Sequence, residues 1–95
     1  MNYKLSSSKK AEKDIEKAIE WYADINKVLA IRFYNDLIKT KKQIQQNPKA
    51  FQIRYSEIRI AFLYKFPFGL HFRIIEDKVF HIVLILAKRL SRALL

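Results

Sequence analysis

Apolar residues recur every three or four positions in the first part of the chain. One such stripe consists of Ala11, Ile15, Ala18 and Tyr22. This spacing is typical of an amphipathic helix with one buried face. Ser8 precedes the stripe and can serve as an N-cap, because its hydroxyl can accept from a free N–H of the first turn. The sequence therefore predicts a helix that begins after Ser8, and a short strand before it over residues 2–6.

A second helical stripe follows a short polar interruption at residues 24–26. Its members are Ala30, Phe33, Leu37, Thr40 and Ile44. Asn47 should end this helix, because the residue before a proline is disfavoured in the helical conformation. Two amphipathic helices separated by so short a gap predict an antiparallel helix hairpin.

Beyond Pro48 the apolar pattern changes to the period of two that is typical of strands. The expected extended segments are residues 53–55, 58–64, 68–75 and 79–87, with a turn at Glu76-Asp77. The whole pattern predicts an α+β fold of order β-α-α-β-β-β, with the helix hairpin packed on one face of an antiparallel sheet. We expect a single domain over residues 1–95.

The turn at Glu76-Asp77 sets which residues of the last two strands share a face. A two-residue turn pairs Ile75 with Lys78 and Arg73 with Phe80. One predicted face carries Phe68, Leu70, Phe72, Ile74, Val79, His81, Val83 and Ile85. The other carries Gly69, His71, Arg73, Ile75, Phe80, Ile82, Leu84 and Leu86. The last strand is apolar on both faces, and the helices can cover only one. The second face therefore indicates a partner surface. A fold-back of residues 91–95 or a homodimer would be the alternatives.

The charge of the chain points to an anionic partner. Nineteen Lys and Arg residues against nine Asp and Glu give a net charge of +10. Such an excess favours nucleic acid, an acidic protein segment or an anionic membrane surface. The absence of cysteine excludes disulfides, thiolate zinc sites and a cysteine nucleophile. No apolar stretch at the start resembles a signal peptide, and no run approaches the ~20 residues of a membrane span. We expect a cytoplasmic protein that does not bind membranes.

Few residues offer catalytic chemistry. The predicted register puts His71 and His81 on opposite faces, so they cannot share a metal or work as an acid–base pair. Carboxylates are sparse after Pro48. We therefore expect no metal and no cofactor. The basic residues around the last strand remain, and these can bind phosphate or carboxylate groups or form a solvated surface.

Several short motifs occur in the order of a known family. They are Asp14-Ile15, Trp21-Tyr22, Arg32-Phe33, Asn47-Pro48, Ile58-Arg59 and Phe66-Pro67-Phe68. Together, over nearly the whole chain, they resemble the RelE/ParE superfamily of bacterial type II toxins, with the ParE-like branch favoured. The resemblance implies the β-α-α-β-β-β fold. It also implies an antitoxin whose C-terminal segment wraps the toxin and folds as it binds. Such a partner would cover the second sheet face and neutralise the positive charge.

The resemblance leaves the cellular target open. RelE-like toxins cut mRNA in the ribosomal A site, whereas ParE-like toxins poison DNA gyrase and are not nucleases. Where the RelE branch has two lysines, an arginine and a C-terminal tyrosine, this chain has Ile60, Phe62, Gly69 and Leu95. Only Arg89 matches. We expect a non-enzymatic toxin that inhibits growth by binding DNA gyrase. The alternatives are a ribosome-dependent mRNA endonuclease of RelE type and an inactive relative that only binds antitoxin.

The predicted surface for target or antitoxin combines apolar and basic residues. Its candidates are Arg59, Arg73, Phe80, Ile82, Leu84, Leu86, Lys88, Arg89 and Arg92. No catalytic residue is assigned, and Arg89 is the one candidate for such a role.

Overall fold

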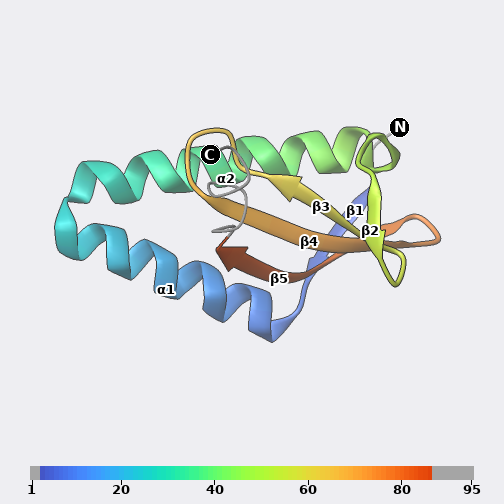
Figure 1. The fold of residues 1–95 in the computed structure, drawn as a ribbon, viewed down its shortest axis with the longest axis horizontal. Helices are drawn as coiled ribbons and strands as arrows, with labels where there is room; N and C mark the ends of the chain where they lie inside the picture. Colours follow the sequence, from blue (N-terminus) through green and yellow to red (C-terminus); the bar gives the residue numbers. More distant parts are fainter. Residues whose placement is uncertain (1–2, 87–95) are drawn as a thin grey trace.

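The computed structural model describes residues 3–86, apart from the side chains of His81, Ile82 and Leu86. The elements are β1 (Lys4–Ser7), α1 (Lys9–Ile25), α2 (Lys27–Gln46), the 3₁₀ turn η1 (Pro48–Ala50), β2 (Ile53–Tyr55), β3 (Ile58–Phe62), β4 (Phe68–Ile75) and β5 (Lys78–Leu86). Figure 1 shows the two helices joined at one end into a hairpin that packs along the sheet. The predicted α+β fold is confirmed.

Local capping groups define both helices at the predicted places. The hydroxyl oxygen of Ser8 accepts a hydrogen bond from the N–H of Ala11 at 3.0 Å. Asn26 serves both helices. Its backbone N–H donates to the carbonyl of Tyr22, and its side-chain oxygen accepts from the N–H of Val28 at 2.7 Å. Caps of this kind satisfy the free backbone groups at helix ends. One residue therefore ends α1 and begins α2, which produces the tight hairpin.

The sheet has five strands in the order β1-β5-β4-β3-β2. Strands β2 to β5 pair antiparallel as predicted, but β1 pairs parallel to β5, so the sheet is mixed. The parallel pairing is possible because the rest of the chain serves as the long connection that parallel neighbours require. Strand β3 ends at Phe62, two residues earlier than expected. The N–H groups of Tyr64 and Lys65 bond to the carboxylate of Asp36 on α2 in place of a neighbouring strand.

A β-bulge changes the faces of β5. The predicted register holds from the Ile75–Lys78 pair to the Phe72–His81 pair. His71 then pairs with Val83, so Ile82 is an extra residue in β5. Because side chains alternate along a strand, one extra residue moves every later side chain to the opposite face.

The bulge overturns the predicted placement of Leu84. Leu84 pairs with Leu70, is only 5% exposed and belongs to the core beneath the helices. The same shift pairs Leu86 with Phe68. The prediction that Leu84 lies on the face away from the helices is wrong, because it assumed an uninterrupted register. The side chain of Leu86 lies outside the described residues, so its placement stays a prediction. Val83 and Ile85 lie on that face instead, and the side chain of Ile85 is 43% exposed.

Aromatic rings join the helices to the sheet. Phe33 of α2 is fully buried, and its ring centroid lies 5.4 Å from Tyr22 of α1. It also lies 5.5 Å from Phe66 and 5.4 Å from Phe68, on either side of Pro67. The contacts with Phe66 and Phe68 are edge-to-face, an arrangement that aromatic pairs favour beyond the area they bury. The Phe-Pro-Phe turn is thus part of the core. No helix in residues 3–86 is long and apolar enough to cross a bilayer.

The bulge predicts losses of stability of different size for two adjacent residues of β5. Leu84→Ala should lower the free energy of unfolding by about 2–4 kcal/mol, because it leaves a cavity in the core. Ile85→Ala should lower it by less than about 1 kcal/mol, because the side chain is partly in solvent. Urea unfolding of both variants provides the measurement. A larger loss for Ile85→Ala than for Leu84→Ala would contradict the bulged register.

Candidate functional site

The face of the sheet away from the helices is the candidate binding surface. Along β4, Leu70 and Phe72 point into the core, so the residues that alternate with them point the other way. We call this surface the outer face. By strand pairing it comprises Tyr55, Ile58, Ile60, Phe62, Gly69, His71, Arg73, Ile75, Phe80, Val83 and Ile85. It is largely apolar, with one exposed arginine among these residues.

Gly69 lies beneath the apolar side chains of the neighbouring strand. A Cβ atom at position 69 would approach Cγ2 of Ile60 to 2.9 Å and Cε1 of Phe62 to 3.2 Å. Any larger side chain at this position would therefore have to displace Ile60. Arg54 of β2 adds a cation near this group, with its guanidinium carbon 5.8 Å from the centroid of the Phe62 ring. Ile60, Phe62 and Gly69 therefore form one apolar patch in this chain.

Tyr55 and His71 form a polar pair on the same face. The Tyr55 hydroxyl and the Nδ1 atom of His71 are 2.7 Å apart, although the two residues lie on different strands with β3 between them. His71 is 8% exposed, and burial lowers the pKa of its imidazole. The imidazole is therefore neutral at neutral pH, and Tyr55 satisfies one of its nitrogens. The sequence did not predict this pair, because no face could be assigned to Tyr55 before the pairing of its strand was known.

The two predicted arginines of the sheet lie on different sides. Arg73 is exposed on the outer face and pairs with Phe80 in the register, so the structure brings these two candidates together. Arg59 pairs with Phe72 and so lies on the helix side of the sheet. Its Nη1 group donates to the carbonyl of Phe51 at 2.6 Å and reaches that of Lys49 at 3.4 Å. Arg59 thus fastens η1 and the segment after it to the sheet, and a role in binding stays a prediction.

The remaining candidates are at the end of the chain. Lys88, Arg89 and Arg92 lie outside the described residues, as do the side chains of Ile82 and Leu86. Their roles stay predictions. Among residues 3–86, no three His, Asp or Glu side chains gather where they could hold a metal ion.

Comparison with known proteins gives the family. The sequence profile described as "ParE toxin of type II toxin-antitoxin system, parDE" matches residues 5–89. The chain belongs to the ParE toxin family. A solved structure titled "Chromosomal ParDE TA system from P. aeruginosa" has a TM-score of 0.75 and 21% sequence identity to this ParE-family chain. The match covers 86% of this chain and 92% of that chain. At this identity the structural match shows a shared fold. A search of curated protein sequences gave no match.

Taken together, the geometry of the outer face suits binding more than it suits chemistry. Several of its large apolar side chains are exposed, among them Phe62, Ile75 and Ile85. Exposed apolar residues gathered in one patch mark interaction surfaces. Tyr55 and His71 are the groups that could exchange a proton there.

Burial of His71 predicts a component of stability that depends on pH. The pKa of His71 is lowered from its ordinary value of 6.5, so the unfolded ParE-family chain binds this proton more readily than the folded one. Stability from this group is fully present above 6.5 and is lost as the pH falls through the lower folded pKa.

This component can be measured by urea unfolding at about pH 7.5 and about pH 5. The wild-type chain should lose more stability on acidification than His71→Gln, whose side chain does not titrate. Identical losses in the two chains would show that His71 is protonated as easily folded as unfolded.

Proposed function

We propose that this ParE-family chain is a toxin that inhibits growth by binding a protein target, DNA gyrase, and that a cognate antitoxin neutralises it. The observation that carries the proposal is the apolar patch of Ile60, Phe62 and Gly69 on the outer face. These positions hold the charged residues of the ribonuclease branch in the resemblance drawn from the sequence.

The chemistry of RNA cleavage explains why the patch matters. In-line attack by a 2′-hydroxyl needs a base for that hydroxyl, an acid for the leaving oxygen and positive charge on the phosphate. Ile60 and Phe62 supply none of these. Gly69 cannot be replaced by a charged residue without moving Ile60, since even a Cβ would lie 2.9 Å from it. An apolar patch of this kind fits contact with another protein surface.

The antitoxin is supported by the family and by two properties of the chain. ParE toxins belong to type II toxin–antitoxin systems, as the family description states. The net charge of +10 favours an acidic partner. Ile75 and Ile85 are exposed on the outer face, where an amphipathic segment could bury them. Such a partner would cover apolar area and neutralise charge at once.

One observation favours the ribonuclease alternative. A phenol and an imidazole 2.7 Å apart, with Arg73 on the same face, are groups that can exchange protons with a bound RNA. Burial of His71 and the apolar surroundings of the pair weigh against this reading. The ribonuclease alternative therefore predicts that mRNA cleavage requires Tyr55 and His71, whereas the gyrase proposal predicts no mRNA cleavage at all.

The two targets separate when the toxin is induced in growing cells. We expect DNA damage signalling and trapped gyrase cleavage complexes, without codon-dependent mRNA cuts. Primer extension on cellular mRNA, together with recovery of gyrase–DNA complexes, provides the measurement. Rapid cuts within translated codons that disappear in Tyr55→Phe and His71→Gln would instead assign the chain to the ribonuclease branch.

Arg89 supplies a second prediction about the target. Arg89→Ala should weaken growth inhibition and leave the thermal unfolding temperature unchanged, because a charge after β5 can contact a target or an acidic antitoxin group. Lys42→Ala, which removes one exposed charge from α2, is the matched control and should retain full toxicity. Equal toxicity of wild type and Arg89→Ala would place this residue on the solvated surface.

A further inference from the structure

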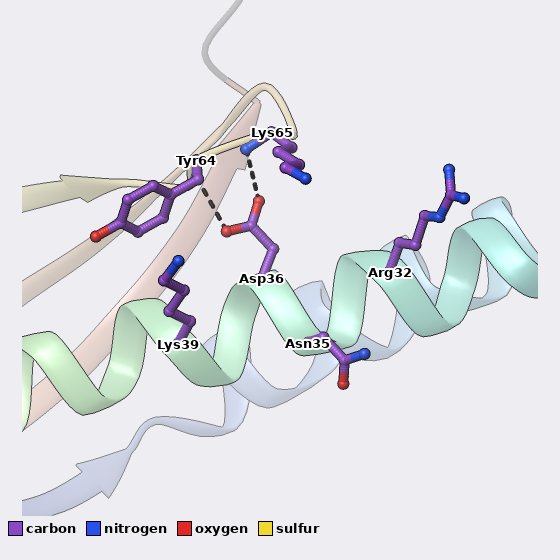
Figure 2. A pocket seen from close by; sticks show the side chains of 6 residues that line it. All are labelled: Arg32, Asn35, Asp36, Lys39, Tyr64 and Lys65. Atoms are coloured by element: carbon purple, nitrogen blue, oxygen red, sulfur yellow. Dashed lines mark hydrogen bonds between the residues drawn. The ribbon is translucent and has the colours of Figure 1, made fainter.

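A basic cleft lies on the helix side of the molecule, apart from the outer face. It is formed by α2 and the loop that joins β3 to β4, and its volume is about 470 Å³. The lining residues are Arg32, Asn35, Asp36, Lys39, Tyr64 and Lys65. Figure 2 shows Lys39 and Tyr64 toward one end, Lys65 and Arg32 toward the other, and Asp36 between them.

The carboxylate in the cleft does not pair with the cations. One oxygen of Asp36 accepts the N–H of Tyr64 at 3.0 Å, and the other accepts the N–H of Lys65 at 2.8 Å. In the described part of the chain, the one ion pair is Lys10 with Asp14 on α1. Three cations against one occupied carboxylate therefore leave the cleft with an excess of positive charge.

The cleft is held in shape before any ligand binds. Arg32 and Lys39 are seven residues apart on one face of α2, a separation of about 10 Å along the helix axis. The loop opposite is fastened to the same helix through Asp36, which is itself 8% exposed. The Lys39 ammonium lies 4.5 Å from the centroid of the Tyr64 ring. A fixed arrangement of this kind lowers the ordering cost of binding.

We propose that this cleft binds an extended acidic segment of the partner protein, with one carboxylate at each end. An extended peptide rises about 3.3 Å per residue, so acidic residues three positions apart span the same ~10 Å as Arg32 and Lys39. The end of the segment bound at Lys39 would also lie near the exposed Tyr64 ring. A single phosphate at the centre would instead face the carboxylate of Asp36. The net charge of +10 supports an acidic occupant. This proposal rests on the proposed function, because the antitoxin is the partner concerned.

Fluorescence anisotropy with the full chain and a labelled peptide containing Glu-Leu-Leu-Glu tests the cleft, with Gln-Leu-Leu-Gln as the neutral control peptide. The acidic peptide should bind, and more weakly as salt is added. Lys39→Ala with Lys65→Ala should weaken its binding by about three- to tenfold, as expected for two exposed ion pairs. Lys13→Ala with Lys17→Ala removes the same charge from exposed positions of α1 and should change binding by less than about twofold.

Three outcomes would contradict the proposal that the cleft binds an acidic segment. They are equal losses in the two double variants, equal binding of the neutral peptide, and displacement of the acidic peptide by inorganic phosphate at comparable concentration. Circular dichroism of both variants confirms that they fold.

Coexpression with the cognate antitoxin separates this proposal from the proposed function. Weaker antitoxin capture by the Lys39/Lys65 variant than by the Lys13/Lys17 variant supports the cleft. If the antitoxin neutralises both variants as well as wild type, the cleft proposal fails and the toxin assignment stands. A wild-type chain that neither inhibits growth nor binds antitoxin would refute the proposed function itself.

Discussion

The packing of Phe33 against three other aromatic rings holds the two layers of this protein together. Phe33 is fully buried and contacts Tyr22 of α1, Phe66 of the β3–β4 loop and Phe68 of β4. These contacts position the helix hairpin over the sheet and bring the loop onto α2. Asp36, three residues further along α2, can then bond to the loop N–H groups. The position of the basic cleft therefore follows from the aromatic core.

The bulge in β5 has the corresponding role for the outer face. Strand β5 is apolar along almost its whole length, so neither face is marked as the buried one by the sequence. The extra residue at Ile82 turns Leu84 into the core, where burial of a leucine side chain contributes about 1.5–3 kcal/mol. It also turns Val83 and Ile85 outward. The apolar outer face is thus partly a consequence of completing the core on the other side.

The sequence predicted those features that depend on neighbouring residues. Ser8, Asn26 and Pro48 act within a few positions of themselves, and both helices begin and end where these residues indicate. The bulge could not be predicted, because the register of a strand is weakly specified when both faces are apolar. The Tyr55–His71 pair joins residues 16 positions apart, and the hydrogen bonds of the Asp36 carboxylate to the β3–β4 loop join residues 28 and 29 positions apart. These contacts form only once the strands and helices have packed. At the site, Arg73 with Phe80 was predicted, whereas the position of Leu84 and the contacts of Arg59 were not.

The apolar patch of the outer face and the basic cleft adjoin one another along the chain. Phe62 ends β3 within the patch, and Tyr64 begins the lining of the cleft two residues later. Two residues span at most about 7 Å, so the patch and the cleft meet at this end of β3 although they face opposite sides of the sheet, and a segment bound to both would pass around this end. Such a segment would be apolar where it meets Ile60 and Phe62 and acidic where it meets Lys39 and Lys65. Whether the apolar or the acidic residues come first in the sequence of the partner depends on the direction in which its segment runs past this end of β3.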